Sequence, residues 1–481
     1  MNVRVISKNV GISLMLNGSV MALCALYAAF NNFDTSFSPL LLGAIISALV
    51  GCFPLIFVKE TSPIKLDEGF LIIVLSWFLC CIFGMIPYVL WGGEFNLVNA
   101  WFESTSGYTT TGASILTDVE SLPRGLLLWR SSTQFLGGIG IVVFMLLILP
   151  SIEQHRSRIS GMEISDLTRG DYRKRTFSII KIRVSVYIGL IILEWIALMI
   201  AGMPAFDAIN ISFTTIATGG FTIKNSSIAS YNSFPIECIV AIFMVLSALH
   251  FGLIYYSVVN RSTKLFKSAP TKLFFKGFTT VGLLITLNLL FTGQETNVWH
   301  ALRVSFFQTI SAASCTGFGV ADASKWPMFS IILLMLMGIQ GGCTGSTTGG
   351  IKTDRVAIFF SSLRAQMVRY MHPDAVVPVK VGKSAIKEDV VSMVNTFIIF
   401  YLLILVVCAL IYCATGMPAI DAFSTSVSCI GGVGSAFGAE GPMGNNSQVP
   451  LLSKFIMPFE MLIGRLELFP FFAIFYIRNK R

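Results

Sequence analysis

Four segments of the chain place hydroxyl residues and a glycine at matching positions, a pattern suited to holding a cation. Aligned on that glycine, they run from Ala100 to Gly112, from Ala208 to Gly220, from Ser305 to Gly317 and from Ala422 to Gly434. Glycine permits backbone angles that aim carbonyl oxygens at a common axis, and a short helix directs partial negative charge from its C-terminal end toward a cation. Four such loops in one chain predict an ion-conducting pore with a single axis.

Hydroxyl side chains recur at two fixed offsets before the glycine. They are Ser104 and Ser106, Ser212 and Thr214, Thr309 and Ser311, and Ser426 and Ser428. Such hydroxyls either contact the ion directly or hold the short pore helices together. For Ser104, Ser212, Thr309 and Ser426 we expect the second role, and for Glu103 in the first pore helix we expect packing or hydrogen bonding.

The composition indicates what positions these loops. Of 481 residues, 54% are hydrophobic and only 12% are charged, which is typical of a bundle of membrane helices. Long apolar runs predict ten transmembrane helices, near residues 9–30, 39–58, 70–91, 125–150, 180–202, 235–259, 274–293, 327–360, 389–415 and 450–477. The expected fold is therefore an all-α integral membrane protein.

A unit of apolar helix, re-entrant pore loop and apolar helix recurs four times. The units cover residues 68–150, 178–260, 272–365 and 388–478, and an extra N-terminal helix pair precedes them at 1–60. All four units start from the same side of the membrane, so the repeats are parallel and surround an axis along the membrane normal. Inverted repeats would instead favour alternating access.

The formal charge of +9 is concentrated in alternate loops, which include residues 151–183, 364–387 and the stretch that starts with Lys352 and Arg355. By the positive-inside rule these loops and both termini are cytoplasmic, and the pore loops open toward the outside. The basic loops either serve topology and contact anionic lipid or form a docking surface for a partner. We expect no nucleic-acid partner.

A glycine-dense stretch interrupts the apolar run 327–360. It comprises Gly341, Gly342, Cys343, Thr344, Gly345, Ser346, Thr347, Thr348, Gly349 and Gly350. This composition cannot continue a stable helix, and a break inside a membrane persists only beside a cavity. A flexible surface loop is the alternative, but the apolar residues up to Phe360 favour a break in mid-span.

Single charged residues lie within other apolar runs. Arg465 either lines the pore, where its charge opposes cation passage, or forms a structural ion pair with Glu460 or Glu467. Arg130, Glu194 and His250 also stand in apolar helices, and we assign them no function.

With these loops, the 341–350 stretch and the motif Gly464-Arg-Leu-Glu-Leu-Phe, the chain resembles the TrkH/KtrB/HKT superfamily of potassium transporters over nearly its whole length. Its length and extra N-terminal helices are most similar to the bacterial TrkH branch. The resemblance implies a filter that binds potassium mainly through backbone carbonyls of Thr110, Thr111, Gly112, Thr218, Gly219, Gly220, Cys315, Thr316, Gly317, Gly432, Val433 and Gly434.

The resemblance also implies that the 341–350 stretch obstructs the pore beneath the filter. It implies a homodimer with one pore in each protomer, a cytosolic ring of TrkA-like nucleotide-binding regulatory domains, and a location in the bacterial inner membrane. Gly112 stands where sodium-selective plant relatives often carry serine, so potassium is the expected ion. Cys315 and Val433 are unusual beside a filter, although only their backbones need contribute.

The function expected from these features is gated, channel-like potassium uptake driven by the membrane potential, with potassium as the transported ion and no organic cofactor. A sodium- or proton-coupled symporter is the main alternative, which the parallel repeats and the absence of paired acidic residues within helices disfavour. A sodium-permeable transporter is a further alternative. A membrane enzyme is disfavoured because the sequence contains no nucleophile–base pair, metal-ligand cluster or phosphate-binding motif.

Overall fold

The computed structural model describes residues 2–58, 64, 66–140, 166–382, 384–434 and 444–472, with side chains except at 66 and 166–179. The first half contains α1 (Val3–Phe30), α2 (Phe37–Phe57), α3 (Leu66–Gly84), α4 (Ile86–Trp91), α5 (Leu97–Tyr108), a helix over 124–140, α7 (Asp166–Ile200), α8 (Ala205–Ile216), η1 (Ser227–Tyr231), α9 (Phe234–Ala248) and α10 (Phe251–Val259).

The second half contains α11 (Lys264–Lys267), α12 (Ala269–Phe291), α13 (Val298–Ala313), η2 (Ala323–Lys325), α14 (Met328–Gln340), α15 (Thr353–Met371), β1 (Lys380–Val381), β2 (Ser384–Ala385), α16 (Glu388–Ala414), α17 (Ala419–Gly431) and α18 (Leu451–Arg465). The mostly helical fold confirms the expected class. A departure is the two-stranded antiparallel hairpin β1–β2, which lies in the basic segment 364–387.

Among the described residues, six helices are long and apolar enough to span a membrane, or seven if the bent pair α9–α10 forms one span. This number does not test the prediction of ten transmembrane helices, because the expected span 125–150 is described only to residue 140. The expected span 327–360 is divided into α14 and α15. The basic residues at 151–165 and the C-terminal residues 473–481 lie outside the described part.

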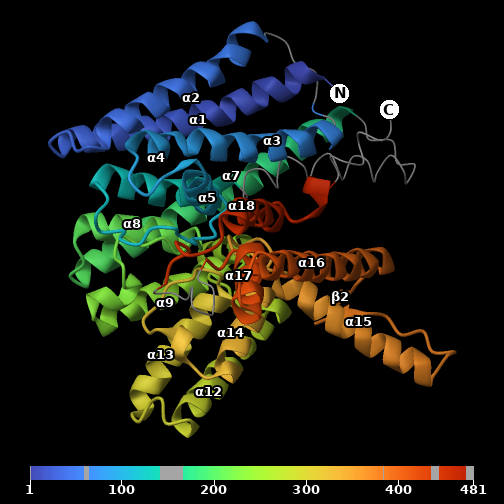
Figure 1. Ribbon diagram of the computed structural model, residues 1–481. Helices are drawn as coiled ribbons and strands as arrows, with labels where there is room; N and C mark the ends of the chain where they lie inside the picture. Colours follow the sequence, from blue (N-terminus) through green and yellow to red (C-terminus); the bar gives the residue numbers. More distant parts are fainter. Residues whose placement is uncertain are drawn as a thin grey trace.

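The helices form a ring of alternating contacts around the centre of the molecule. α9 packs against α8 and α13, α14 against α13 and α17, and α18 against α17 and α5. The α1–α2 pair lies at the edge, where α1 packs on α3, and α15 and α16 extend away from the body (Figure 1). Each of α9, α14 and α18 thus touches the short helix before it in sequence and one from another segment.

The four short helices α5, α8, α13 and α17 are rich in Ser and Thr and are largely enclosed by protein. In α5, every residue from Ala100 to Tyr108 is buried. Hydroxyl-rich helices that end in mid-membrane would be costly against lipid, so they require this enclosure.

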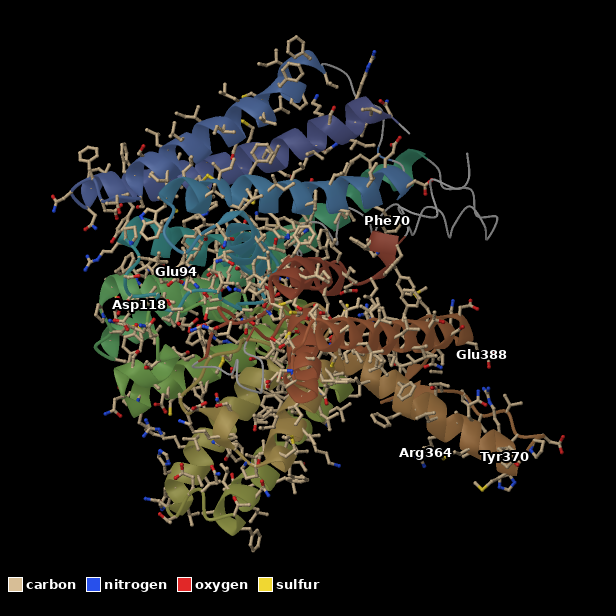
Figure 2. All side chains as sticks on the ribbon, in the orientation of Figure 1. Phe70, Glu94, Asp118, Arg364, Tyr370 and Glu388 are labelled. Atoms are coloured by element: carbon tan, nitrogen blue, oxygen red, sulfur yellow. The ribbon has the colours of Figure 1, made fainter. Side chains whose placement is uncertain are left out.

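Charged residues lie at opposite ends of the molecule, with Glu94 and Asp118 at one end and Arg364 and Glu388 at the other (Figure 2).

Candidate functional site

The four short helices end in the same backbone conformation, and we call the residues that follow them glycine loops 1 to 4 (residues 110–112, 218–220, 315–317 and 432–434). The first residue of each loop is left-handed, with φ of 52° at Thr110, 54° at Thr218, 54° at Cys315 and 65° at Gly432. The last has φ of 84° at Gly112, 76° at Gly220, 82° at Gly317 and 86° at Gly434. Left-handed φ is unusual for Thr and Cys, so its recurrence at equivalent positions indicates one shared loop geometry.

Hydrogen bonds explain this geometry. The middle N–H of each loop donates to the carbonyl five residues earlier, in the pairs Thr111–Ser106 (2.9 Å), Gly219–Thr214 (2.8 Å), Thr316–Ser311 (2.9 Å) and Val433–Ser428 (3.0 Å). This is the Schellman helix end, in which a left-handed residue lets the chain turn while the last helical carbonyls remain bonded. The loops therefore leave their helices at a fixed angle.

Neighbouring loops touch through a carbonyl oxygen and a glycine. A Cβ atom on Gly112 would lie 1.7 Å from the Gly219 oxygen, one on Gly220 would lie 1.9 Å from the Thr316 oxygen, and one on Gly434 would lie 2.0 Å from the Thr111 oxygen. No side chain fits at these distances. Loop 1 thus lies between loops 4 and 2, and loop 2 lies between loops 1 and 3.

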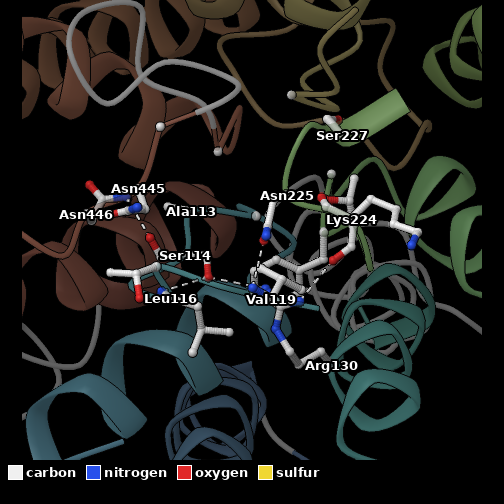
Figure 3. Close-up of a pocket in the computed structure, with 18 residues that line it drawn as sticks. Ala113, Ser114, Leu116, Val119, Arg130, Lys224, Asn225, Ser227, Asn445 and Asn446 are labelled. Atoms are coloured by element: carbon white, nitrogen blue, oxygen red, sulfur yellow. Dashed lines mark hydrogen bonds between the residues drawn. The ribbon is translucent and has the colours of Figure 1, made fainter. Parts of the chain in front are cut away.

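A cavity of about 100 Å³ lies where the four loops meet, lined by Gly112, Gly220, Gly317 and Gly434 together (Figure 3). Its other lining residues follow the glycines in sequence. Two hydrogen bonds link these segments across the cavity, from Asn446 N–H to the Ser114 carbonyl (2.9 Å) and from Val119 N–H to the Asn225 side chain (2.8 Å). The structure therefore brings together all twelve sequence-predicted loop residues.

The hydroxyl groups at the first of the two offsets donate either to a neighbouring helix or to their own helix. Ser104 donates to the Cys81 carbonyl of α3 (2.7 Å) and Ser426 to the Leu405 carbonyl of α16 (2.9 Å), which confirms their predicted role in holding pore helices. The prediction is wrong for Ser212 and Thr309, whose hydroxyls bond carbonyls of their own helices. The link between α12 and α13 uses Thr286 and Ser305 instead.

The glycine-dense stretch 341–350 forms a loop on the side of the ring opposite the cavity. The Thr347 hydroxyl donates to the carbonyl of Ile216 at the end of α8 (2.8 Å). A Cβ atom on Gly349 would lie 2.0 Å from the carbonyl oxygen of Gly431, at the end of α17. Since the loop contacts residues that precede the glycine loops, and the cavity is lined by residues that follow them, the two lie on opposite sides.

The base of the 341–350 loop is closed. Ile351 N–H donates to the Ile339 carbonyl and Lys352 N–H to the Gln340 carbonyl, both at 2.9 Å. The ends of the loop, Gly341 and Gly350, are in direct contact. The chain therefore leaves α14, forms the loop and returns to the same place before α15 begins.

Arg465 bonds to carbonyls rather than to a carboxylate. Its guanidinium donates to the Thr347 oxygen (2.7 Å) and to the Gly137 oxygen (3.2 Å). Of the two carboxylates proposed as ion-pair partners, Glu460 accepts hydrogen bonds from Tyr412 and Ser426, and Glu467 pairs with Arg355 at 2.6 Å. Within the described residues, Arg465 forms no ion pair with either carboxylate.

Lys352 was predicted to be one of the cytoplasmic loop charges, and this prediction is wrong. It is buried, with 4% of its surface exposed, and its ammonium group donates to the Thr348 carbonyl and hydroxyl. The reason is the closed base of the loop: residues 351–353 return beneath it and carry Lys352 inward, with φ of 81°. Two buried cations, Lys352 and Arg465, thus contact the 341–350 loop.

A buried ion pair that was not predicted from the sequence lies beside glycine loop 1. Arg130, from the helix 124–140, contacts Glu103 of α5 at 2.7 Å, and their side chains are 2% and 0% exposed. Arg130 also donates to the Thr222 carbonyl (3.1 Å) and lies 4.1 Å from the centroid of the Phe221 ring. An unpaired charge inside a membrane helix is costly. The presence of one basic and one acidic residue in such helices is the signal by which sequence alone could have paired them.

Comparisons with known proteins agree with this architecture. A sequence profile of the TrkH family, described as cation transport protein, matches residues 39–480. The chain belongs to the TrkH family of cation transport proteins. It is 34% identical over 424 residues to the Trk system potassium uptake protein TrkH of Salmonella typhimurium, covering 87% of this chain and 86% of that protein.

Two further relatives are similar over comparable lengths. The Trk system potassium uptake protein TrkG of Escherichia coli is 31% identical over 433 residues, which cover 87% of this chain and 86% of that protein. The crystal structure of the potassium transporter TrkH from Vibrio parahaemolyticus superimposes with a TM-score of 0.89 at 31% identity, covering 98% of both chains. Family membership confirms the resemblance found in the sequence.

We expect Arg130→Met to lower the free energy of unfolding by about 3–5 kcal/mol, since it leaves Glu103 as a buried carboxylate without its cation. The double variant Glu103→Gln/Arg130→Met should recover most of that loss. The measurement is chemical or thermal unfolding of the purified protein in detergent. As a control, Lys224→Met removes an exposed ion pair with Glu120 and should change stability little; equal losses in Arg130→Met and Lys224→Met would contradict the assignment.

Proposed function

We propose that this chain is the ion-conducting subunit of a Trk-type system that takes up potassium across the bacterial inner membrane. The observation that carries the proposal is the ring of glycine loops, in which carbonyl oxygens of one loop approach the glycine of the next. The relatives named above, which are potassium uptake proteins, support potassium as the ion.

The glycine loops act as the selectivity filter in this proposal. Carbonyl oxygens of residues 110–112, 218–220, 315–317 and 432–434 replace the hydration shell of potassium. The helices that precede them direct the negative ends of their dipoles toward the same centre. The cavity beyond the glycines is the outer entrance, and its position beside Asn446 and Asn225 makes it polar.

The gate consists of the 341–350 loop together with Arg465. The loop lies on the side of the ring opposite the entrance, tied to the ends of α8 and α17. Arg465 holds the Thr347 carbonyl, and as a cation it opposes the passage of other cations. Withdrawal of the loop by a movement of α15 opens the path, because α15 begins directly after the loop.

Topology and partners complete the proposal. Ten transmembrane helices form the four parallel repeats and the N-terminal pair, with both termini in the cytoplasm. Two copies form a homodimer with separate pores, and a cytosolic TrkA-like ring with nucleotide-binding domains docks on the basic segments 151–183 and 364–387. Arg364, in the second half of α15 (Figure 2), is exposed and is suited to contact such a ring or anionic lipid.

Growth at low potassium tests the proposal directly. Expression of this chain in a bacterium that lacks its own potassium uptake should restore growth in micromolar potassium. Rubidium uptake into proteoliposomes should follow the imposed membrane potential with no sodium or proton gradient. A requirement for either gradient would replace the channel-like mechanism with symport, and failure of growth with protein present in the membrane would overturn potassium uptake.

Gly112→Ser should raise sodium permeation relative to potassium, since its side chain would collide with the Gly219 oxygen and disturb the carbonyl ring. The measurement is the ratio of sodium to rubidium flux in proteoliposomes. Gly202→Ser is the matched control, because Gly202 has φ of 93° but no atom near its Cβ position. Equal sodium and potassium flux in the unmodified protein, or an unchanged ratio in Gly112→Ser, would contradict a selective filter at this ring.

Arg465→Ala should increase cation flux and leave the protein folded. The guanidinium is bonded to two carbonyls, so its removal leaves no buried carboxylate without a partner. Flux is measured per folded protein, quantified by size-exclusion chromatography. Lys325→Ala removes an exposed charged contact, with Asp322, and serves as the control. A loss of folded Arg465→Ala protein without any gain in flux rejects the gating role.

Deletion of residues 343–348 should produce a pore that, without the partner ring, conducts more than the parent does alone. Gly341 and Gly350 already touch, so the remaining Gly342 and Gly349 can close the connection as a tight turn. Single-channel or flux recordings of the deletion variant, alone in a bilayer, provide the measurement. If this variant folds, reaches the membrane and conducts no more than the parent, the loop is not the gate.

A further inference from the structure

Glycine loop 2 lacks a side-chain support that loops 1 and 3 carry within themselves. In loop 1 the Thr111 hydroxyl bonds the Thr109 hydroxyl, and in loop 3 the Thr316 hydroxyl bonds the Ser314 hydroxyl, both at 2.8 Å. The equivalent residues of loop 2 are Gly219 and Ala217, which have no hydroxyl group. Gly219 and Gly220 are also consecutive glycines, so the backbone of this loop has unusual conformational freedom.

The missing support comes from another repeat. Gln134, on the helix 124–140, is fully buried, and its amide nitrogen donates to the Gly219 carbonyl at 2.9 Å. Its amide oxygen accepts from Phe221 N–H at 3.2 Å. A Cβ atom on Gly219 would lie 2.3 Å from the Gln134 amide carbon, so the glutamine occupies the space that a threonine side chain fills in loops 1 and 3.

The helix that carries Gln134 is fixed one turn earlier by Arg130. Arg130 pairs with Glu103 and donates to the Thr222 carbonyl. Because residues four apart lie on the same face of a helix, Arg130 and Gln134 together contact loop 2 and the two residues after it. The Glu103–Arg130 ion pair and the Gln134 amide thus meet the same segment from one face of one helix.

We propose that Gln134 is a positioning residue for ion selection: it fixes the direction of the Gly219 carbonyl from outside the loop. This inference rests on the proposed function of the glycine loops as the filter. A carbonyl oxygen has two acceptor sites, so the amide of Gln134 occupies one and the other remains for the ion. Without the amide, this peptide between two glycines loses its only hydrogen bond to the helix 124–140 among the described residues, and we expect its oxygen to depart from the spacing that suits potassium.

The test compares two buried glutamines. Gln134→Met keeps the volume of the side chain but removes both hydrogen bonds, and we expect the ratio of potassium to sodium permeability to fall roughly three- to tenfold, the factor that one hydrogen bond contributes. Gln308→Met is the matched control, since Gln308 is 3% exposed and donates to the Ala321 carbonyl, outside the glycine loops. Permeability ratios are measured by rubidium and sodium flux in proteoliposomes, a readout that is independent of the amount of protein.

A compensating variant separates positioning from a general structural role. Gly219→Thr alone should impair flux, because its side chain meets the Gln134 amide. The triple variant Ala217→Thr/Gly219→Thr/Gln134→Ala gives loop 2 the hydroxyl pair of loop 1 and should restore selectivity toward that of the parent.

The outcomes are distinct from those that test the filter itself. A parent protein that does not select potassium overturns the proposed function, whatever Gln134 does. A selective parent with an equally selective Gln134→Met variant overturns the role of Gln134 alone. Loss of folding in Gln134→Met with no recovery in the triple variant also overturns it, since the residue is then required for folding and not for the direction of one carbonyl.

Discussion

The rest of the structure depends on the approach of a carbonyl oxygen to the α-carbon of a glycine in the next loop. At Gly112, Gly220 and Gly434 that oxygen occupies the position where a side chain would begin. Such contacts bring the loops close enough for their carbonyls to share one small centre. At Gly112 and Gly434 they also require that the preceding helix ends at a fixed residue, since a shift of one position toward the helix would replace the glycine with Thr111 or Val433, whose side chain collides.

The short helices follow from the same constraint. To meet at one centre, four helices must end inside the protein, and their hydroxyl groups and terminal carbonyls must be satisfied without lipid contact. The surrounding helices permit this through small residues at the points of contact: Cβ atoms on Gly137 and Gly464 would lie 2.0 Å from the Tyr108 oxygen and 2.2 Å from the Ile430 oxygen. The ring of glycine loops is therefore held by a second set of glycines in the helices behind it.

The 341–350 loop introduces non-helical backbone whose carbonyls need donors within the membrane. Arg465 and Lys352 provide them, at Thr347 and Thr348 respectively. Both side chains donate hydrogen bonds and accept none, and both carry positive charge. If the loop is the gate proposed above, the groups that satisfy its carbonyls are also the groups that would repel a cation, so one arrangement would both close the path and stabilise its closed state.

Sequence predicted the parts of this molecule that repeat. The four aligned glycines are visible because identical spacing recurs, and the interruption after Gln340 is visible because glycine is dense there. The helical class is visible in the long apolar runs, and the family in the motifs that it shares. The contacts between repeats were not visible. Arg130 and Glu103 are 27 residues apart, Arg465 lies 118 residues from Thr347, and no local pattern connects such pairs.

Lys352 and Arg465 also show why the location of a charged residue, and its partner, could not be predicted from composition. A lysine at the end of an apolar run is typical of a cytoplasmic loop, whereas the closed base of the 341–350 loop carries this one inward. Equally, Glu467 was a reasonable partner for Arg465 in sequence, but the left-handed backbone at Glu467, with φ of 56°, accompanies its pairing with Arg355 instead. The burial of Lys352 and the pairing of Glu467 with Arg355 both follow from the local direction of the backbone, which sequence spacing does not reveal.

The four glycine loops share one backbone conformation, but different groups support them. Loops 1 and 3 use their own hydroxyl pairs, and loop 2 uses Gln134 from another repeat. In a ring of four identical subunits each loop would need the same support, and any blocking segment would occur four times. A single chain whose loops differ can interrupt one helix after Gln340, place one loop beneath the ring and hold it with one arginine. In the proposed mechanism, a movement of one helix would then control the whole path.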